Sequence, residues 1–220
     1  MPNFGRSTDK TDMSKAKAVN KSGRGEYIEL FKSLILFLAI ALCLRASVVE
    51  AFKIPSSSMV PTLEIGDHIL VSKLSYGLRL PLKTDTLFNY SLPDRGDVVV
   101  FTKPDDPLTP EEDESDKNIV KRVVGLPGDL VEVRGTKVYI NDKEYKGDSQ
   151  YAVWSSGGVR DFPPTYVPEN KVFLLGDNRD HSKDSRYWPD PFLSVSRIKG
   201  RAFIIYWNTS MLQRMFSIIH

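Results

Sequence analysis

The sequence predicts a mostly β fold of antiparallel sheets, preceded by one transmembrane helix. Two observations support this: an unbroken apolar run from Leu34 to Leu44 and, from Phe52 onward, short β-rich runs that alternate with glycine and proline turns. No long stretch after Val49 has the periodicity of a helix. The expected strands are Ile69–Ser72, Val98–Phe101, Ile119–Val124, Leu130–Val133, Lys137–Ile140, Lys171–Leu175 and Ala202–Trp207.

The apolar run predicts a membrane anchor over residues 30–49. Leu34–Leu44 alone is shorter than the roughly 20 residues that cross a bilayer. Extending it in both directions gives enough length, provided that Lys32 and Arg45 reach the two interfaces with their charged ends. Two other interpretations remain open: a signal peptide cleaved near Val49-Glu50-Ala51, and a buried helix of a soluble protein.

Residues 1–29 form a polar segment that predicts a disordered tail. Up to Lys32 the chain carries seven basic and four acidic residues. By the positive-inside rule this excess keeps the tail in the cytoplasm and places the rest of the chain, beyond the anchor, on the other side of the membrane.

Composition excludes several classes of function. The chain has 220 residues and a formal net charge of +2, with basic and acidic residues interleaved, so nothing indicates a nucleic-acid partner. Cys43 is the only cysteine, which excludes a disulfide within the chain and a cysteine-based metal site. The three histidines are far apart and form no metal-ligand pattern, so we expect neither a metal nor a cofactor.

The β-rich part is expected to form one domain over residues 52–210. A pair of hairpins is predicted between Val131 and Tyr145, with turns at Gly135 and at Asn141-Asp142. Residues 211–220 form an apolar tail that fits either a short amphipathic helix or a final edge strand. Long irregular connections are expected at Lys83–Arg95, Lys103–Lys117 and Asp148–Asn170.

The stretch Pro55–Leu63 holds three consecutive hydroxyls, Ser56 to Ser58, between Pro55 and Pro61. Proline fixes its own backbone and pushes the preceding residue toward extended geometry. The serines should therefore lie in a short, stiff segment, which is what an aimed nucleophile requires. Taken alone, the same composition is more typical of a surface loop.

Lys121 and Arg122 lie side by side on a predicted strand that ends in a glycine–proline turn. Neighbours on a strand face opposite ways, so one side chain should face solvent and the other the core or a cleft. A lysine in an apolar setting loses its charge readily and becomes a competent base for a serine hydroxyl. The alternative is that both are surface charges of an edge strand.

Residues 176–188 form a polar loop after a predicted strand. A calcium loop is excluded because Arg179 stands where an oxygen ligand is needed. A triad of Ser182, His181 and Asp184 is conceivable, but the three are too close along the chain to adopt triad geometry easily. The loop also fits a scaffold in which Asp184 and Arg186 pair and hydroxyls orient a group from another segment.

Four stretches in this order, behind an anchor, resemble the signature motifs of bacterial type I signal peptidases. The resemblance covers most of residues 30–207. Its motifs are Pro55–Leu63 followed by Gly66-Asp67, Arg95–Phe101, Lys121–Asp129 and Gly176–Arg186.

The resemblance implies a serine–lysine mechanism. Ser58, directly before Met59, matches the nucleophile, and Lys121 matches the general base. The Ser58 backbone N–H and the Ser56 hydroxyl match the oxyanion hole. No metal or cofactor takes part in this chemistry.

The resemblance also implies a set of supporting residues. Ser182 matches the residue that hydrogen-bonds and positions the lysine, and Gly176 lines the site near it. Asp184 and Arg186 match a supporting ion pair. The implied fold is an antiparallel β domain with a barrel-like or sandwich-like arrangement.

By the same resemblance, the substrates are secretory preproteins cut after small residues at positions −3 and −1. The partners are then signal peptides and the lipid bilayer, and the location is the bacterial inner membrane, with the catalytic domain on the periplasmic side. Two rival functions remain: a relative that processes a narrow client, and a catalytically inactive binding domain on an anchor.

Overall fold

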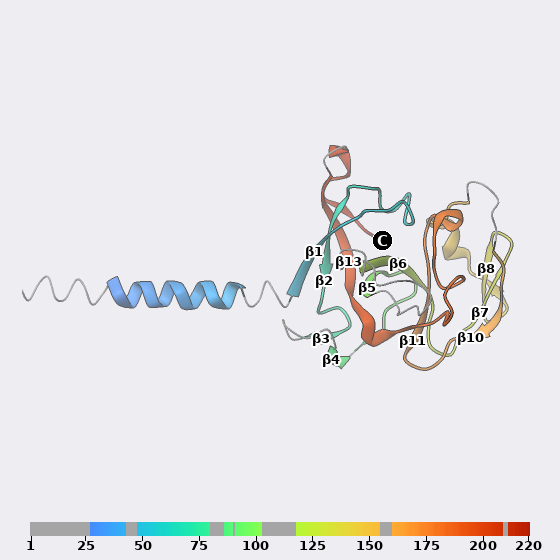
Figure 1. Ribbon diagram of the computed structural model, residues 1–220, viewed down its shortest axis with the longest axis horizontal. Coiled ribbons are helices and arrows are strands. Elements are labelled where there is room, and N and C mark those ends of the chain that lie inside the picture. Colours follow the sequence, from blue (N-terminus) through green and yellow to red (C-terminus); the bar gives the residue numbers. More distant parts are fainter. Residues whose placement is uncertain are drawn as a thin grey trace, which may run out of the picture. The chain divides into compact units, whose positions relative to one another are not determined.

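The computed structural model describes residues 27–42, 48–79, 86–89, 91–102, 118–154, 160–208 and 211–220. The chain divides into two compact units, residues 1–45 and 46–220. The described part of the first unit is a helix over residues 27–42 (Figure 1). The second unit is built almost entirely from strands and short turns (Figure 1). The prediction of a mostly β fold with antiparallel pairing is confirmed.

The strands of the second unit begin and end as follows: β1 Val49–Lys53, β2 His68–Ser72, β3 Gly77–Arg79, β4 Thr86–Asn89, β5 Val98–Thr102, β6 Asn118–Gly125, β7 Leu130–Arg134, β8 Lys137–Ile140, β9 Lys143–Glu144, β10 Phe162–Tyr166, β11 Lys171–Leu175, β12 Leu193–Ser194, β13 Ile198–Trp207 and β14 Ser217–Ile218. Short 3₁₀ helices connect them: η2 Lys146–Gln150, η3 Arg179–His181, η4 Val195–Arg197 and η5 Leu212–Arg214.

Within the described residues, the strands form a main sheet and two smaller ones. The main sheet runs in the order β1-β2-β13-β5-β6-β11-β12, and β14 adds to β13. A four-stranded sheet follows the order β10-β7-β8-β9, and β3 pairs with β4. The described strands at the two ends of the main sheet do not pair with each other, so the barrel-like closure in the predicted fold is not present.

All seven predicted strands are confirmed within a few residues at their ends. The two predicted hairpin turns are confirmed as well. Gly135 has a φ of 57°, and Asn141 and Asp142 have φ values of 52° and 65°. Two successive residues with positive φ suit the tight turn that joins β8 to β9, where Asn and Asp are tolerated.

The predicted anchor extends too far toward the C-terminus. The described helix ends at residue 42, residues 43–47 lie outside the described part, and Val49 already belongs to β1, opposite Ser72 of β2. The β-branched residues at this boundary suit a strand as well as a helix. In the part of the chain that the structure describes, no helix is both long enough and apolar enough to cross a bilayer.

Two of the predicted irregular connections contain regular structure. β4 lies within Lys83–Arg95, and β10 lies within Asp148–Asn170. The third, residues 103–117, falls outside the described part, as does most of the predicted tail over residues 1–29.

The C-terminal tail belongs to the second unit and forms the edge strand that was one of its two alternatives, while the amphipathic helix is not formed. A single 3₁₀ turn, η5, is followed by the edge strand β14, which pairs with β13. Arg214 forms an ion pair with the buried Asp67, with 2.8 Å between Nη2 and Oδ2. Ile219 is buried in the core cluster that also holds Met59 and Leu63.

Candidate active site

Ser58 lies in a loop between β1 and β2 that is fixed at both ends. The Ile54 N–H donates to the Asp67 carbonyl at 2.8 Å, which closes the base of the loop. Met59 and Leu63 are fully buried in the core, and the Leu63 N–H donates to the Met59 carbonyl at 2.8 Å. The residue next to Ser58 is therefore anchored in the core, and the predicted stiff segment around the serines has a physical basis.

Lys121 lies on β6 with its amine 2.7 Å from the hydroxyl oxygen of Ser58. Its side chain is buried, with 3% of the residue exposed. Burial lowers the pKa of the Lys121 amine to about 8, against the opposing attraction of Asp184 and Asp177. A substantial fraction of the amine is then neutral near pH 8 and able to take a proton from a hydroxyl.

The expectation that one of Lys121 and Arg122 faces solvent is wrong. Arg122 is fully buried, like its neighbour. β6 lies inside the main sheet, between β5 and β11, and polar loops cover the side chains on both of its faces. A strand that is covered on both faces leaves neither neighbour in water.

Gly176 and Ser182 belong to the loop after β11, and they meet beside Ser58. A β carbon at position 176 would lie 2.2 Å from Ser182 Oγ and 2.5 Å from the Ser58 carbonyl oxygen. Both separations are far below van der Waals contact, so only glycine fits without displacing the loop that carries Ser58.

The predicted hydrogen bond between Ser182 and the lysine is not formed in this structure. Ser182 Oγ is buried, and within the described part of the chain it has no hydrogen-bond partner. An unpaired buried hydroxyl is costly, and such groups are common where a partner appears only during function.

Asp184 and Arg186 form the predicted ion pair, and both are buried. Arg186 donates from Nε to Asp184 Oδ1 at 2.8 Å and from Nη2 to Oδ2 at 2.9 Å. The Gly176 N–H also donates to Asp184, at 3.0 Å. The pair therefore holds the start of the loop as well as its end. The alternative triad is not assembled, because Asp184 is paired with arginine and His181 is exposed.

Ser56 is exposed, with its hydroxyl oxygen 3.4 Å from that of Ser58. Both serines line a cleft of about 560 Å³ that also contains Lys121. The cleft runs between residues 51–53 of β1 and residues 118–121 of β6. The site thus brings together a hydroxyl, a buried amine and a second hydroxyl at the wall of a groove large enough for an extended peptide.

The sequence profile described as "Signal peptidase, peptidase S26" matches residues 27–207 of this chain. The chain belongs to this family. Signal peptidase I of Pseudomonas fluorescens is 38% identical over an alignment that covers 81% of this chain and 72% of that protein.

Two further relatives extend the comparison. Signal peptidase I of Leptolyngbya laminosa is 33% identical and covers 93% of this chain and 92% of its own length. Thylakoidal processing peptidase 1 of Arabidopsis thaliana is 34% identical and covers 81% of this chain and 48% of its own length.

In this S26 family member, Asn178 and Asp177 contact the loop that carries Ser58, and no role was predicted for either. Asn178 donates from its backbone N–H to the Ser58 carbonyl and from Nδ2 to the Ser57 carbonyl, both at 3.1 Å. Asp177 accepts a hydrogen bond from Thr62 at 2.5 Å. The sequence offered their polarity and their place in the motif Gly176–Arg186 as signals. The contacts themselves could not be predicted, because the partners lie more than a hundred positions away.

Proposed function

We propose that this chain is a membrane-attached serine endopeptidase that removes N-terminal signal peptides from exported preproteins. The observation that supports this most strongly is the 2.7 Å separation between the buried Lys121 amine and the Ser58 hydroxyl. Serine–lysine pairs are an established variant of the hydrolytic triad. Signal peptidase I is also the name of the relatives from Pseudomonas fluorescens and Leptolyngbya laminosa.

The proposed reaction begins with proton transfer from Ser58 Oγ to the neutral Lys121 amine while Oγ attacks the scissile carbonyl. The tetrahedral intermediate collapses as the Lys121 ammonium returns a proton to the leaving amine, which leaves an acyl-enzyme at Ser58. Water activated by the same lysine then hydrolyses the ester. In these reaction steps, Lys121 carries out both proton transfers that histidine performs in the serine–histidine–aspartate triad.

The developing oxyanion requires hydrogen-bond donors. The Ser58 backbone N–H and the Ser56 hydroxyl are the proposed donors, and each such donor contributes roughly 3 kcal/mol to lowering the barrier. Ser182 is the proposed partner of the lysine. Its hydroxyl is buried without a partner among the described residues, so it can accept a hydrogen bond when the amine becomes an ammonium.

The substrate is proposed to bind as an extended strand in the cleft. β1 is the terminal strand of the main sheet, and the described pairs of β11 with β6 begin at Arg122, which leaves one edge of residues 118–121 open. Two open edges on either side of a groove can hydrogen-bond an added strand. The groove is lined by Ile54 and Met59, which are fixed in the core, so larger side chains at −1 and −3 are expected to clash.

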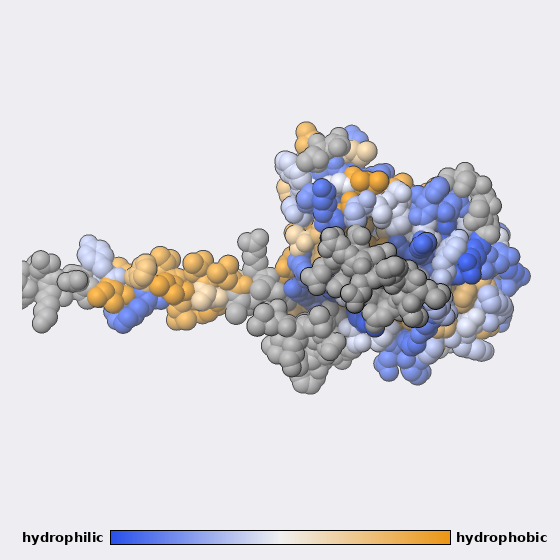
Figure 2. Space-filling model, viewed as in Figure 1, coloured by the Kyte–Doolittle hydropathy of each residue, from blue (hydrophilic) through white to orange (hydrophobic). Residues whose placement is uncertain are grey.

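Helix 27–42 is the proposed site of membrane attachment. Its apolar side chains are exposed along the helix (Figure 2). Phe37, for example, is 71% accessible. A water-exposed helix with this composition would be costly, whereas lipid would cover it. In the proposed topology the N-terminus lies in the cytoplasm and the β-rich unit on the periplasmic side of a single-pass inner-membrane protein.

Membrane attachment predicts that the full chain floats with anionic phospholipid vesicles in a density gradient. Flotation should persist at about 1 M salt, because burial of apolar surface is not screened by ions. Recovery of the chain at the bottom of the gradient in both low and high salt would contradict attachment by this helix.

The function itself predicts that the purified chain, in detergent, cuts a preprotein with an Ala-x-Ala site immediately after the second alanine. Cleavage should be unchanged by a metal chelator, because the proposed chemistry uses only side chains and water. The product is identified by the mass of the released mature protein. Failure to cut this preprotein would favour a narrow-client peptidase or an inactive anchored domain, and restoration of chelator-inhibited cleavage by a metal would contradict the serine–lysine mechanism.

A further inference from the structure

The segment from Tyr145 to Trp154, which we call the brace, packs against the loop that follows β11. It consists of η2 with the residues on either side, and it follows the hairpins of the four-stranded sheet. Val153 pairs with the loop through its backbone: its N–H donates to the Asp177 carbonyl at 2.8 Å, and its carbonyl accepts from the Arg179 N–H at 3.0 Å. The brace is thereby joined to the loop that contacts the Ser58 carbonyl.

Tyr151 of the brace covers the guanidinium of Arg122. The centre of its ring lies 3.7 Å from Arg122 Cζ, which is close stacking for a cation–π pair. The Tyr151 hydroxyl lies 2.8 Å from the hydroxyl of Tyr145, so the ring is held in its orientation as well as its position.

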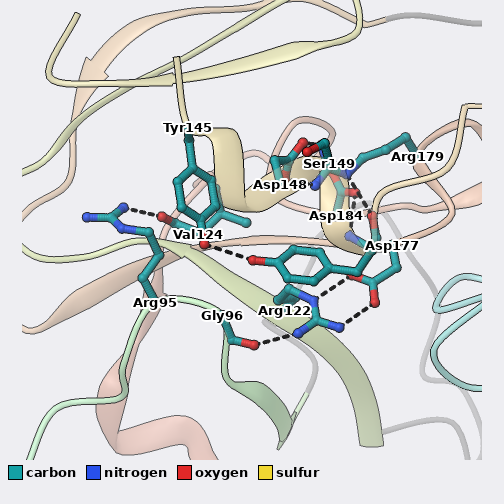
Figure 3. Close-up of polar contacts among 12 residues, drawn as sticks. Arg95, Gly96, Arg122, Val124, Tyr145, Asp148, Ser149, Asp177, Arg179 and Asp184 are labelled. Carbon is teal, nitrogen blue, oxygen red and sulfur yellow. Dashed lines mark hydrogen bonds and ion pairs between the residues drawn. The ribbon is translucent and has the colours of Figure 1, made fainter. Parts of the chain in front are cut away.

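All three side-chain nitrogens of Arg122 donate hydrogen bonds beneath this ring. It donates to Asp177 from Nε at 2.8 Å and from Nη2 at 2.7 Å, and from Nη1 to the Gly96 carbonyl at 2.6 Å (Figure 3). Asp177 in turn accepts a hydrogen bond from the hydroxyl of Thr62, which belongs to the loop that carries Ser58. The contacts therefore run continuously from the brace, through Arg122 and Asp177, to the segment that carries Ser58.

Asp148 makes a second connection of the same kind. Its carboxylate accepts from both terminal nitrogens of Arg179, which is fully buried (Figure 3). Arg179 donates from Nε to the Gly176 carbonyl at 3.0 Å. The brace therefore carries two side chains, Asp148 and Tyr151, that each fix an arginine of the site.

We propose that Tyr151 is a positioning residue of the peptidase, whose ring excludes water from the Arg122–Asp177 pair and so keeps Asp177 bound to Arg122, the neighbour of Lys121 on β6. This inference rests on the proposed function for its kinetic consequences. Its geometric content, the covering of the Arg122–Asp177 pair by the ring, stands apart from any substrate.

Loss of the ring would act on Lys121 through Asp177. Water would reach the Arg122–Asp177 pair and weaken it. Asp177, held less firmly by Arg122, would then attract the lysine ammonium more strongly, which raises the pKa of the amine. The ionic side chains packed around this part of the site are Arg122, Asp148, Asp177, Arg179, Asp184 and Arg186.

Tyr151→Leu is the test, and it should raise the pKa of Lys121 by about half to one unit, which lowers the neutral fraction about 3- to 10-fold below that pKa. The rising limb of the kcat–pH profile should shift to higher pH by the same amount, with KM unchanged. Tyr151→Phe keeps the ring and should restore the wild-type profile. Tyr139→Leu is the matched control, because it removes a ring stacked on Arg134 in the four-stranded sheet, away from the site.

A second readout does not require turnover. Reductive methylation of Lys121 by formaldehyde with cyanoborohydride as the hydride donor, followed by mass spectrometry across a pH series, reports the titration of the amine even if no preprotein is cut. A higher midpoint in Tyr151→Leu, but not in Tyr151→Phe or Tyr139→Leu, supports the proposal. An unchanged midpoint, or equal shifts in Tyr151→Leu and Tyr139→Leu, overturns it. If Tyr151→Leu does not fold, Tyr151→Met, which better preserves volume, is measured in the same way and judged by the same outcomes.

Discussion

Ser58→Ala is expected to abolish preprotein cleavage, with kcat lowered at least about 10⁴-fold. The substitution removes the oxygen that lies 2.7 Å from the Lys121 amine and leaves the base with nothing to activate. Met59 remains buried and the base of the loop remains closed, so the fold should be kept. Single-turnover cleavage of the Ala-x-Ala preprotein, with the variant in excess, measures the loss directly.

The two neighbouring serines provide graded controls for this experiment. Ser57→Ala should leave kcat within about threefold of wild type, because the contact this residue makes with Asn178 uses its backbone carbonyl, which alanine keeps. Ser56→Ala should lower kcat about 10²- to 10³-fold, the loss typical of one oxyanion donor. Substantial cleavage by Ser58→Ala, or equal losses in all three variants, would exclude Ser58 as the nucleophile.

The strands were predictable from the sequence because each carries its own local signal. Runs such as Val98–Phe101 and Lys171–Leu175 are rich in β-branched and apolar residues between turn residues, and the structure contains both. β10 was not predicted, because two prolines interrupt its five residues and its hydrogen bonds come from a distant partner, β7. Sequence patterns report local preference and are silent about long-range pairing.

The proximity of Ser58 and Lys121 was predicted through the resemblance of whole motifs, whereas the burial of Arg122 was not. A strand pattern specifies two opposite faces, but whether both are covered depends on segments far away in the chain. Tyr151 illustrates the limit: it lies in a stretch that looked like an irregular connection, and only the folded chain brings its ring over Arg122.

The activity should rise with pH through about 8, because the proposed base Lys121 would act in its neutral form and burial lowers its pKa to about 8. Above this pKa the amine is neutral and the rate approaches a plateau. At two units below it only about 1% of the amine is neutral, so kcat should fall about 100-fold near pH 6. Initial rates across a pH series, with a fixed preprotein in detergent, give the profile. A rate that stays flat down to pH 5 would contradict Lys121 as the base.

Lys121→Arg is expected to be as inactive as Lys121→Ala at every pH, since a guanidinium cannot lose its proton in this range. Lys121→Met separates loss of the base from loss of the fold. Below pH about 8 the buried lysine is protonated in both the folded and unfolded states, so the folded protein carries the full cost of burying a charge. Methionine removes that cost, and the unfolding temperature at pH 7 should be equal to or above that of wild type. An arginine variant that retained more than a few per cent of wild-type kcat would show that the proton from Ser58 goes elsewhere.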